Sequence, residues 1–292
     1  MSSPTPDRPV TAPSIRARKR REGAEPVVMV TAYDEPGARI VDEGGADVIL
    51  VGDSVANNVL GYDDTLHVTI DDMARHTAAV ARARPRCLVV GDMPWLSYHL
   101  SVEEAVRNAA TLVRAGAGAV KLEGGRSRIP VIEAIVRAEI PVMGHIGLTP
   151  QSVLAMGGYR VQAKSVDAAQ VLLDAAKALA AAGCFAIVLE GVPDLVAAAV
   201  TEAIDVPTIG IGAGAGCDGQ VLVFHDLLGL GSRTPPKFVR RYANLAEVAT
   251  AAVAAYAADV RSGAFPGEAE SYHAPAELRE ALLDEGTPEA GS

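Results

Sequence analysis

Aromatic residues and long apolar runs are both scarce in this chain. Phe, Trp and Tyr make up only 4% of its 292 residues, so a core must be built from Val, Ile, Leu and Ala. Those residues are typical of parallel strands that helices bury on both faces. No apolar run approaches the roughly 18 to 20 residues that span a bilayer. We therefore predict no membrane association.

Cysteine is also rare. The three cysteines, Cys87, Cys184 and Cys217, lie far apart, and neither they nor the six histidines form a closely spaced metal-ligand pair such as CxxC. An odd number of cysteines, without a leader peptide, predicts reduced thiols and a cytoplasmic protein.

Positive charge is in the minority. Lys and Arg number 26 against 36 Asp and Glu, a net charge of -10, which disfavours a nucleic-acid partner. The one basic run, at 16–21, resembles a nuclear or nucleic-acid signal. It lies between Ser14, a good N-cap residue, and Gly23, a good C-terminal stop. We therefore favour a short N-terminal surface helix.

Apolar residues are abundant, at 49% against 21% charged, which is enough for a sizeable core. Eight short apolar runs recur, and most of them end in glycine or a polar residue. Several are β-branched and continuous rather than alternating, which predicts strands buried on both faces. The runs are 27–33, 47–54, 87–94, 119–125, 140–147, 185–192, 206–214 and 220–228.

Helical stretches separate most of these runs. The segment 101–116 opens on a serine cap and closes on Gly116, and 165–183 repeats that design. The segment 193–204 starts on Pro193, in keeping with proline's place at the first helical position.

Strand and helix alternating eight times predict an α/β fold, a closed (β/α)8 TIM barrel with a short N-terminal helix. The alternative is a doubly wound open sheet with a second domain, but no linker rich in Pro, Gly or charge divides 27–262. We predict one catalytic barrel over 14–273. The Ser/Pro/Thr-rich segment 1–13 is predicted to be a disordered tail, and 274–292 a flexible one.

Charged and polar residues follow the apolar part of five predicted strands. In a barrel of this kind the strands' C-terminal ends form the active site. Any one of these residues could serve as a structural ion pair, but together they surround one mouth, and the acids outnumber the lysine. Oxygen ligands of this type favour Mg²⁺ or a similar hard cation. The residues are Asp53, Ser54, Asp92, Lys121, Glu123, His145 and Glu190.

Seven motifs in order resemble the ketopantoate hydroxymethyltransferase family. The resemblance covers about 14–273 and includes PPKFVRRYANL at 235–245. A lone GDS or GxG would be weak evidence, but an ordered set across seven strand ends is specific. The motifs are GDS at 52–54, GDMP at 91–94, VKLEGG at 120–125, GHIGLTPQS at 144–152, GGYRVQ at 157–162, LEGVP at 189–193, and IGIGAG with DGQVLV at 209–223.

The resemblance implies a barrel of the phosphoenolpyruvate mutase and isocitrate lyase superfamily. It also implies a reaction of pantothenate biosynthesis. In that reaction 3-methyl-2-oxobutanoate, 5,10-methylenetetrahydrofolate and water give 2-dehydropantoate and tetrahydrofolate through a metal-stabilised enolate. The expected cofactor is Mg²⁺ or a similar divalent cation, with the folate as co-substrate. The expected assembly is a homo-oligomer, a decamer in this family.

The resemblance also implies roles for individual residues. Asp53 and Asp92 resemble the direct metal ligands, through which the substrate also binds. Glu123 resembles a further acid of the metal site, bonding directly or through water. Contacts to the substrate's carboxylate and keto oxygens match Ser54 and Lys121, and the proton acceptor matches Glu190.

His145 has three candidate roles. It orients the substrate, hydrogen-bonds an acid of the metal site, or is a satisfied polar residue of the core. We favour the second role.

Other interpretations remain open. Residues 214–219 formally fit the dinucleotide fingerprint GxGxxG, but a strand rather than a helix follows them, so a close-packed loop is favoured. A related C–C lyase or mutase would carry a catalytic cysteine, a role that none of the three cysteines obviously fills. A non-catalytic barrel would be expected to have lost Asp53, Asp92 or Glu190.

Overall fold

The computed structural model describes residues 8–19, 24–231 and 235–284, and the chain divides into two compact units, 1–243 and 244–292. In the first unit, eight parallel strands close into a barrel in chain order. The predicted (β/α)8 barrel is confirmed, and the open doubly wound sheet is wrong. The strands are β1 (Val27–Thr31), β2 (Val48–Val51), β3 (Leu88–Asp92), β4 (Ala119–Glu123), β5 (Val142–Gly147), β6 (Ala186–Glu190), β7 (Thr208–Ile211) and β8 (Gly219–Leu222).

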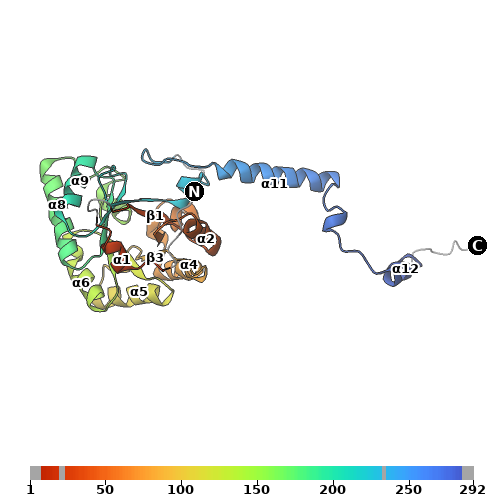
Figure 1. Ribbon diagram of the computed structural model, residues 1–292, viewed down its shortest axis with the longest axis horizontal. Coiled ribbons are helices and arrows are strands. Elements are labelled where there is room, and N and C mark those ends of the chain that lie inside the picture. Colours follow the sequence, from red (N-terminus) through yellow and green to blue (C-terminus); the bar gives the residue numbers. More distant parts are fainter. Residues whose placement is uncertain (1–7, 20–23, 232–234, 285–292) are drawn as a thin grey trace, which may run out of the picture. The chain divides into compact units, whose positions relative to one another are not determined.

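Helices surround these strands, and Figure 1 shows α2, α4, α5, α6, α8 and α9 arranged around them. The helices after β1 to β6 are α2 (Glu35–Glu43), α3 (Val55–Asn58), α4 (Ile70–Arg82), α5 (Val102–Arg114), α6 (Ile129–Arg137), α7 (Val153–Met156), α8 (Val166–Ala181) and α9 (Asp194–Ala203). Short 3-10 turns lie at Thr65–His67, Arg126–Arg128 and Pro150–Ser152.

The predicted helix caps are mostly confirmed. The hydroxyl of Ser101 accepts from the Glu104 amide at 3.1 Å, and that of Ser165 accepts from the Ala168 amide at 3.2 Å. Each bond satisfies an amide that has no partner inside its helix. Pro193 differs from the prediction, because it is the N-cap of α9 and the helix begins at Asp194.

The short N-terminal helix is present, but it begins earlier than predicted. It is α1 (Ala12–Arg16), and its N-cap is Thr11 rather than Ser14. Ser14 is instead the third helical residue (N3), and it closes a capping box because its hydroxyl accepts from the Thr11 amide at 2.9 Å. Residues 20 and 21 of the basic run, and the glycine predicted to stop the helix, lie outside the described residues.

Helix α1 closes the N-terminal end of the barrel. Its Ile15 is fully buried and packs in the cluster of side chains that fills the barrel interior. Nearby, Arg18 pairs with Asp47, just before β2, and Lys19 Nζ lies 2.8 Å from Asp218 Oδ2, just before β8. With that end closed, the opposite mouth is left for a site.

The structure around β8 corrects the predicted strand 220–228 and decides the alternative left open for the glycine-rich segment 214–219. The predicted run 220–228 is strand only to Leu222, and Phe224–Leu228 form helix α10, which ends at the left-handed Gly229. The glycine-rich segment before β8 is a loop that opens no helix, so the dinucleotide fingerprint is wrong. A Cβ at Gly219 would lie 2.4 Å from the Val27 carbonyl, which shows how closely β8 approaches β1.

The second unit contains α11 (Leu245–Ser262), a 3-10 turn (Glu268–Glu270) and α12 (Ala276–Asp284). Helix α12 therefore lies within the segment predicted to be a flexible tail. The predicted extension of the catalytic barrel to 273 stays a prediction. Among the described residues, no helix is long and apolar enough to cross a membrane.

Candidate active site

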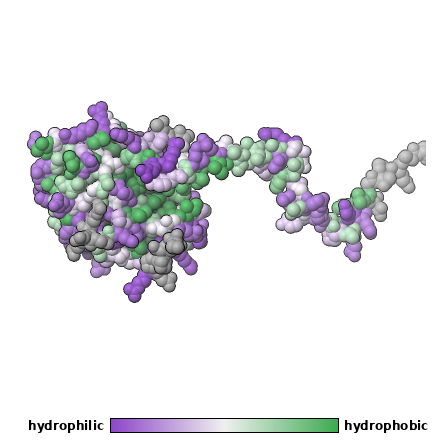
Figure 2. All heavy atoms as spheres, turned by 45° about the horizontal axis from the view of Figure 1, so that its top comes forward, coloured by the Kyte–Doolittle hydropathy of each residue, from purple (hydrophilic) through white to green (hydrophobic). Residues whose placement is uncertain are grey.

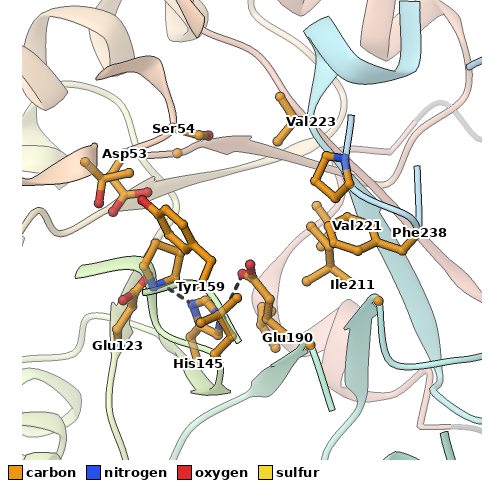
Figure 3. A pocket seen from close by; sticks show the side chains of 18 of the residues that line it. Asp53, Ser54, Glu123, His145, Tyr159, Glu190, Ile211, Val221, Val223 and Phe238 are labelled. Carbon is orange, nitrogen blue, oxygen red and sulfur yellow. Dashed lines mark ion pairs between the residues drawn. The ribbon is translucent and has the colours of Figure 1, made fainter. Parts of the chain in front are cut away.

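All seven residues selected from the sequence line one cavity at the C-terminal mouth of the barrel. Its volume is about 860 Å³, within the range of small-molecule sites. Figure 3 shows Asp53, Ser54, Glu123 and His145 on one side of this cavity, with Glu190 facing them. The strand ends of a parallel barrel meet at one face, which is why residues so far apart in sequence converge.

Lys121 is the central cation of the charged side. It is 3% exposed, and β4 pairs with β3 so that Lys121 stands opposite Asp92. Its Nζ lies 2.9 Å from Asp92 Oδ1 and 3.8 Å from Glu123 Oε1. Burial opposes the charge of the lysine, but the acids around it outweigh burial and raise its pKa. Lys121 therefore stays charged at the base of the cavity.

Asp53 and Asp92 are two buried acids held side by side. The amide of Asp53 donates to Asp92 Oδ2 at 3.1 Å. Burial, followed by repulsion from Asp92 and Glu123, raises the pKa of Asp53 well above its usual range. Burial also raises the pKa of Asp92, although Lys121 opposes this shift. Lys121 therefore offsets only part of the cost of burying these two acids together.

His145 joins two carboxylates, and dashed lines in Figure 3 mark both contacts. Its Nδ1 lies 3.3 Å from Glu123 Oε1, and its Nε2 lies 3.3 Å from Glu190 Oε2. Burial and the charge of Lys121 lower the pKa of His145. The two glutamates outweigh both effects and raise that pKa to about 9. His145 is therefore a cation at neutral pH and contacts an acid of the predicted metal site.

Glu190 is more exposed to the cavity than the other three acids at the strand ends, Asp53, Asp92 and Glu123. It ends β6, and its side chain is 16% exposed while that of His145 is 3% exposed. Among the described residues, no acid other than Glu123 and Glu190 contacts His145 within 4 Å. Glu190 is thus separated from Lys121 by the imidazole and available to a ligand.

Gly147 explains how β5 and β6 can place Glu190. Its φ of +98° is one that side-chain-bearing residues rarely adopt, and an added Cβ would lie 2.3 Å from the Glu190 carbonyl oxygen. That oxygen accepts from the Leu148 amide at 2.8 Å. A larger residue at 147 would therefore displace the backbone that carries Glu190.

We expect Gly147→Ala to destabilise the protein by about 1 to 3 kcal/mol through strain and loss of this contact. The change is measured by urea unfolding. The matched control is Gly45→Ala, which also has positive φ (+84°) but has nothing within 4 Å of the new Cβ. Equal losses in the two variants would contradict a role for the Glu190 carbonyl.

Gln151 is a site residue that the sequence did not single out, although it lies within the motif 144–152. Its Nε2 donates to Asp53 Oδ2 at 2.9 Å and to the Met93 carbonyl at 3.0 Å, and its amide donates to Glu123 Oε2 at 3.0 Å. The hydroxyl of Tyr98 donates to Gln151 Oε1 at 2.6 Å, so both ends of the Gln151 side-chain amide are hydrogen-bonded. Gln151 thus fixes two of the acids.

The donor set fits a cation held by two carboxylates. Among the described residues, no three Asp, Glu, His or Cys side chains are grouped closely enough to hold a metal by themselves. Mg²⁺ usually takes one or two carboxylates and completes its shell with water and substrate oxygens. Asp53 and Asp92 meet that need, because burial raises the pKa values of both acids even with Lys121 beside Asp92, and a bound cation would offset that cost. Glu123 lies beside this pair, where its oxygens contact the Gln151 amide and His145 Nδ1.

Apolar side chains gather on the side of the cavity away from the Asp53–Asp92 pair, although the lining also includes Asp194, Asp226 and Lys237. Ile211, Val221, Val223 and Phe238 lie across from Asp53 in Figure 3, beyond Glu190. The cavity therefore joins a charged half to an apolar half, with Glu190 between them.

Barrel fold and acidic mouth together define a (β/α)8-barrel enzyme, and solved structures share this fold. A phosphoenolpyruvate phosphomutase from Streptomyces platensis subsp. rosaceus aligns with a TM-score of 0.57 at 18% identity, over 94% of this chain and 96% of that one. A 2,3-dimethylmalate lyase, described as a PEP mutase/isocitrate lyase superfamily member, aligns with a TM-score of 0.57 at 19% identity, over 94% and 95%.

Sequence comparison defines the family within this fold. The model of ketopantoate hydroxymethyltransferase matches residues 9–268. The 3-methyl-2-oxobutanoate hydroxymethyltransferase of Methylobacterium sp. (strain 4-46) is 56% identical over 93% of this chain and 94% of its own length. This chain therefore belongs to the ketopantoate hydroxymethyltransferase family, and it is a transferase.

Proposed function

We propose that the chain transfers a hydroxymethyl group from 5,10-methylenetetrahydrofolate to 3-methyl-2-oxobutanoate, giving 2-dehydropantoate for pantothenate biosynthesis. The names and high identity of its relatives support the acceptor. The observation that carries the proposal is the arrangement of Asp53, Asp92 and Lys121 in one half of the cavity, with Glu190 facing them.

The charged half binds the oxo acid in this proposal. Lys121 offers a positive charge to the carboxylate or keto oxygen, and Ser54 offers a hydroxyl. Asp53 and Asp92 hold Mg²⁺ or a similar divalent cation. The bound cation supplies the charge that draws in both substrate oxygens and stabilises negative charge on the keto oxygen.

Glu190 takes the proton from C3 of the oxo acid. Its carboxylate lies outside the Asp53–Asp92 pair, so it does not compete with the substrate for the cation. The contact from His145 Nε2 at 3.3 Å holds the Glu190 carboxylate in place. A carboxylate held at this position can serve as a general base toward C3.

The apolar half leaves room for the one-carbon donor. An oxo acid of this size fills only a small part of the 860 Å³ cavity. The deprotonated C3 would lie between the two halves, so that the donor's methylene carbon approaches it from the apolar side. The bond between the methylene carbon and the folate nitrogen then breaks, tetrahydrofolate leaves, and water supplies the hydroxyl group of the product.

A C–C lyase or mutase that uses a cysteine is disfavoured. All three cysteines are buried, and burial raises the pKa values of Cys87 and Cys184, the latter to about 12. None of them is among the described residues that line the 860 Å³ cavity. A thiol in these places cannot act on a ligand there.

The test is an assay of 2-dehydropantoate formation from 3-methyl-2-oxobutanoate and 5,10-methylenetetrahydrofolate. Mass spectrometry would follow the product, and related 2-oxo acids would serve as alternative acceptors. Product that depends on both substrates supports the proposal. Cleavage of a larger acid in place of product would instead support the lyase alternative.

We also propose that the protein is a homo-oligomer, a decamer by its family resemblance. Within its own unit, helix α11 buries no residue, and its apolar side chains include Val248, Val253 and Tyr256. Figure 2 shows this helix mostly in white and green. Apolar surface of this kind favours association. Light scattering at micromolar concentration is expected to show a large assembly, and a monomer would refute it.

A further inference from the structure

A chain of three hydroxyl groups runs from the barrel wall into the cavity. Thr31 Oγ1, at the end of β1, donates to Tyr33 Oη at 3.0 Å. Tyr33 Oη lies 2.9 Å from Ser54 Oγ, just after β2. At the outer end, the amide of Phe224 donates to Thr31 Oγ1 at 3.0 Å. Four residues from three strand ends thus form one continuous set of hydrogen bonds.

The first member of this set gives the chain a direction. A backbone amide only donates, so the Thr31 hydroxyl accepts a hydrogen bond from the Phe224 amide. The same hydroxyl donates a hydrogen bond to the Tyr33 oxygen. A phenol has one hydrogen, and the oxygen of Tyr33 already receives one. The contact with Ser54 fits a donor at either end, but among the described residues Ser54 is the one other hydroxyl within hydrogen-bond reach of Tyr33, so the geometry assigns the hydrogen of Tyr33 to Ser54. The hydrogen of Ser54 is left to point elsewhere.

Ser54 has no competing use for that hydrogen among the described residues. It occupies the N-cap position of α3, where a serine normally accepts from the helix, yet its side chain makes no capping bond. Ser54 lines the cavity, and within the described part of the chain its side chain hydrogen-bonds only Tyr33. A Cβ at Gly52 would lie 3.0 Å from Ser54 Oγ, so the turn holds the hydroxyl closely.

Tyr33 itself is shielded from the ligand. It is 4% exposed, and it is not among the residues that line the cavity. Burial raises the pKa of Tyr33 to about 12, although its hydrogen bonds to Ser54 and Thr31 oppose this shift. The phenol therefore keeps its hydrogen over the whole range in which an enzyme of this kind is assayed.

We propose that Tyr33 is a positioning residue that holds the Ser54 hydroxyl as a hydrogen-bond donor toward an anionic oxygen of the oxo acid. This inference rests on the proposed function for its ligand. It concerns affinity rather than proton removal, because neither Tyr33 nor Ser54 contacts Glu190. Without Tyr33, the Ser54 hydroxyl can rotate and spend part of its time directed away from the ligand.

The experiment uses the full-length protein loaded with Mg²⁺, and compares Tyr33→Phe, Ser54→Ala and the double variant. We measure the dissociation constant of 3-methyl-2-oxobutanoate by calorimetry and the rate of C3 deuterium exchange at saturation. Tyr33→Phe is expected to weaken binding about 2- to 12-fold, the range of one net hydrogen bond, with the saturated rate within about twofold. In the Ser54→Ala background it should weaken binding no further.

Two results would overturn the proposal. One is unchanged affinity in Tyr33→Phe, and the other is an equal loss with and without the Ser54 hydroxyl, since a purely structural role predicts additive losses. Tyr272→Phe, at a fully exposed tyrosine, is the control. Wild-type protein that neither binds nor exchanges 3-methyl-2-oxobutanoate would instead refute the proposed function.

A second pair of variants keeps the test decisive if Tyr33→Phe does not fold. Thr31→Val removes the hydroxyl that donates to Tyr33, so that Tyr33 can accept from Ser54 instead. Thr31→Ser keeps that hydroxyl. Affinity should fall in the valine variant and stay near wild type in the serine variant, and equal affinities in both would reject the directed chain.

Discussion

Replacing Glu190 with glutamine is expected to slow deuterium exchange at C3 of 3-methyl-2-oxobutanoate by about 10²- to 10⁴-fold, the usual loss when a general base is removed. The change keeps the side chain's shape and leaves Asp53 and Asp92 in place, so the oxo acid should bind with near wild-type affinity. Exchange needs no folate. It therefore isolates proton removal from hydroxymethyl transfer.

Proton NMR of the C3 position in deuterium oxide measures this rate, with calorimetry for affinity. Glu133→Gln, at an acid on the surface of α6, is the matched control and should exchange at the wild-type rate. If Glu190 served only as a structural partner of His145, the variant would lose binding or stability first. Exchange at the wild-type rate would mean that Glu123 or His145 is the base.

Removing the metal is expected to have the second large effect. Chelation should abolish turnover, and added Mg²⁺ should restore it, because the oxo acid binds largely through the cation. Asp53→Ala or Asp92→Ala should weaken metal and oxo-acid binding together. The loss should exceed the roughly 10- to 100-fold typical of losing a group that only supports a ligand. Calorimetry with Mg²⁺ and with the oxo acid measures both affinities.

Removing the charge of Asp53 with a substitution of the same shape is expected to raise stability in the absence of metal. Burial and neighbouring acids raise the pKa of Asp53, so its ionised form opposes folding at neutral pH when no cation is bound. Metal-free Asp53→Asn should therefore unfold at a higher temperature than the metal-free wild type. Asp174→Asn, on the exposed face of α8, is the control and should change neither the unfolding temperature nor the affinity for Mg²⁺.

Full turnover in excess chelator would rule out the metal mechanism.

The fold was largely predictable because it depends on patterns within single elements. Continuous apolar runs such as 185–192 report burial on both faces, and serine caps such as Ser101 mark where helices begin. Errors lie at the ends of elements. The run 220–228 kept its apolar character beyond β8 because α10 buries Phe224 as a strand would, and composition alone does not separate these two cases.

The sequence by itself also determined which charged residues meet, because parallel strands place their C-terminal ends at one mouth. How those residues pair was decided only by the tertiary structure. Gln151 bonds Asp53 across 98 positions of the chain, and Phe224 bonds Thr31 across 193. Such contacts depend on barrel closure and on the conformations of individual side chains. Neither leaves a periodic signal in the sequence. The contacts of His145 with Glu123 and Glu190, and the direction of the Ser54 hydroxyl, could therefore be found only in three dimensions.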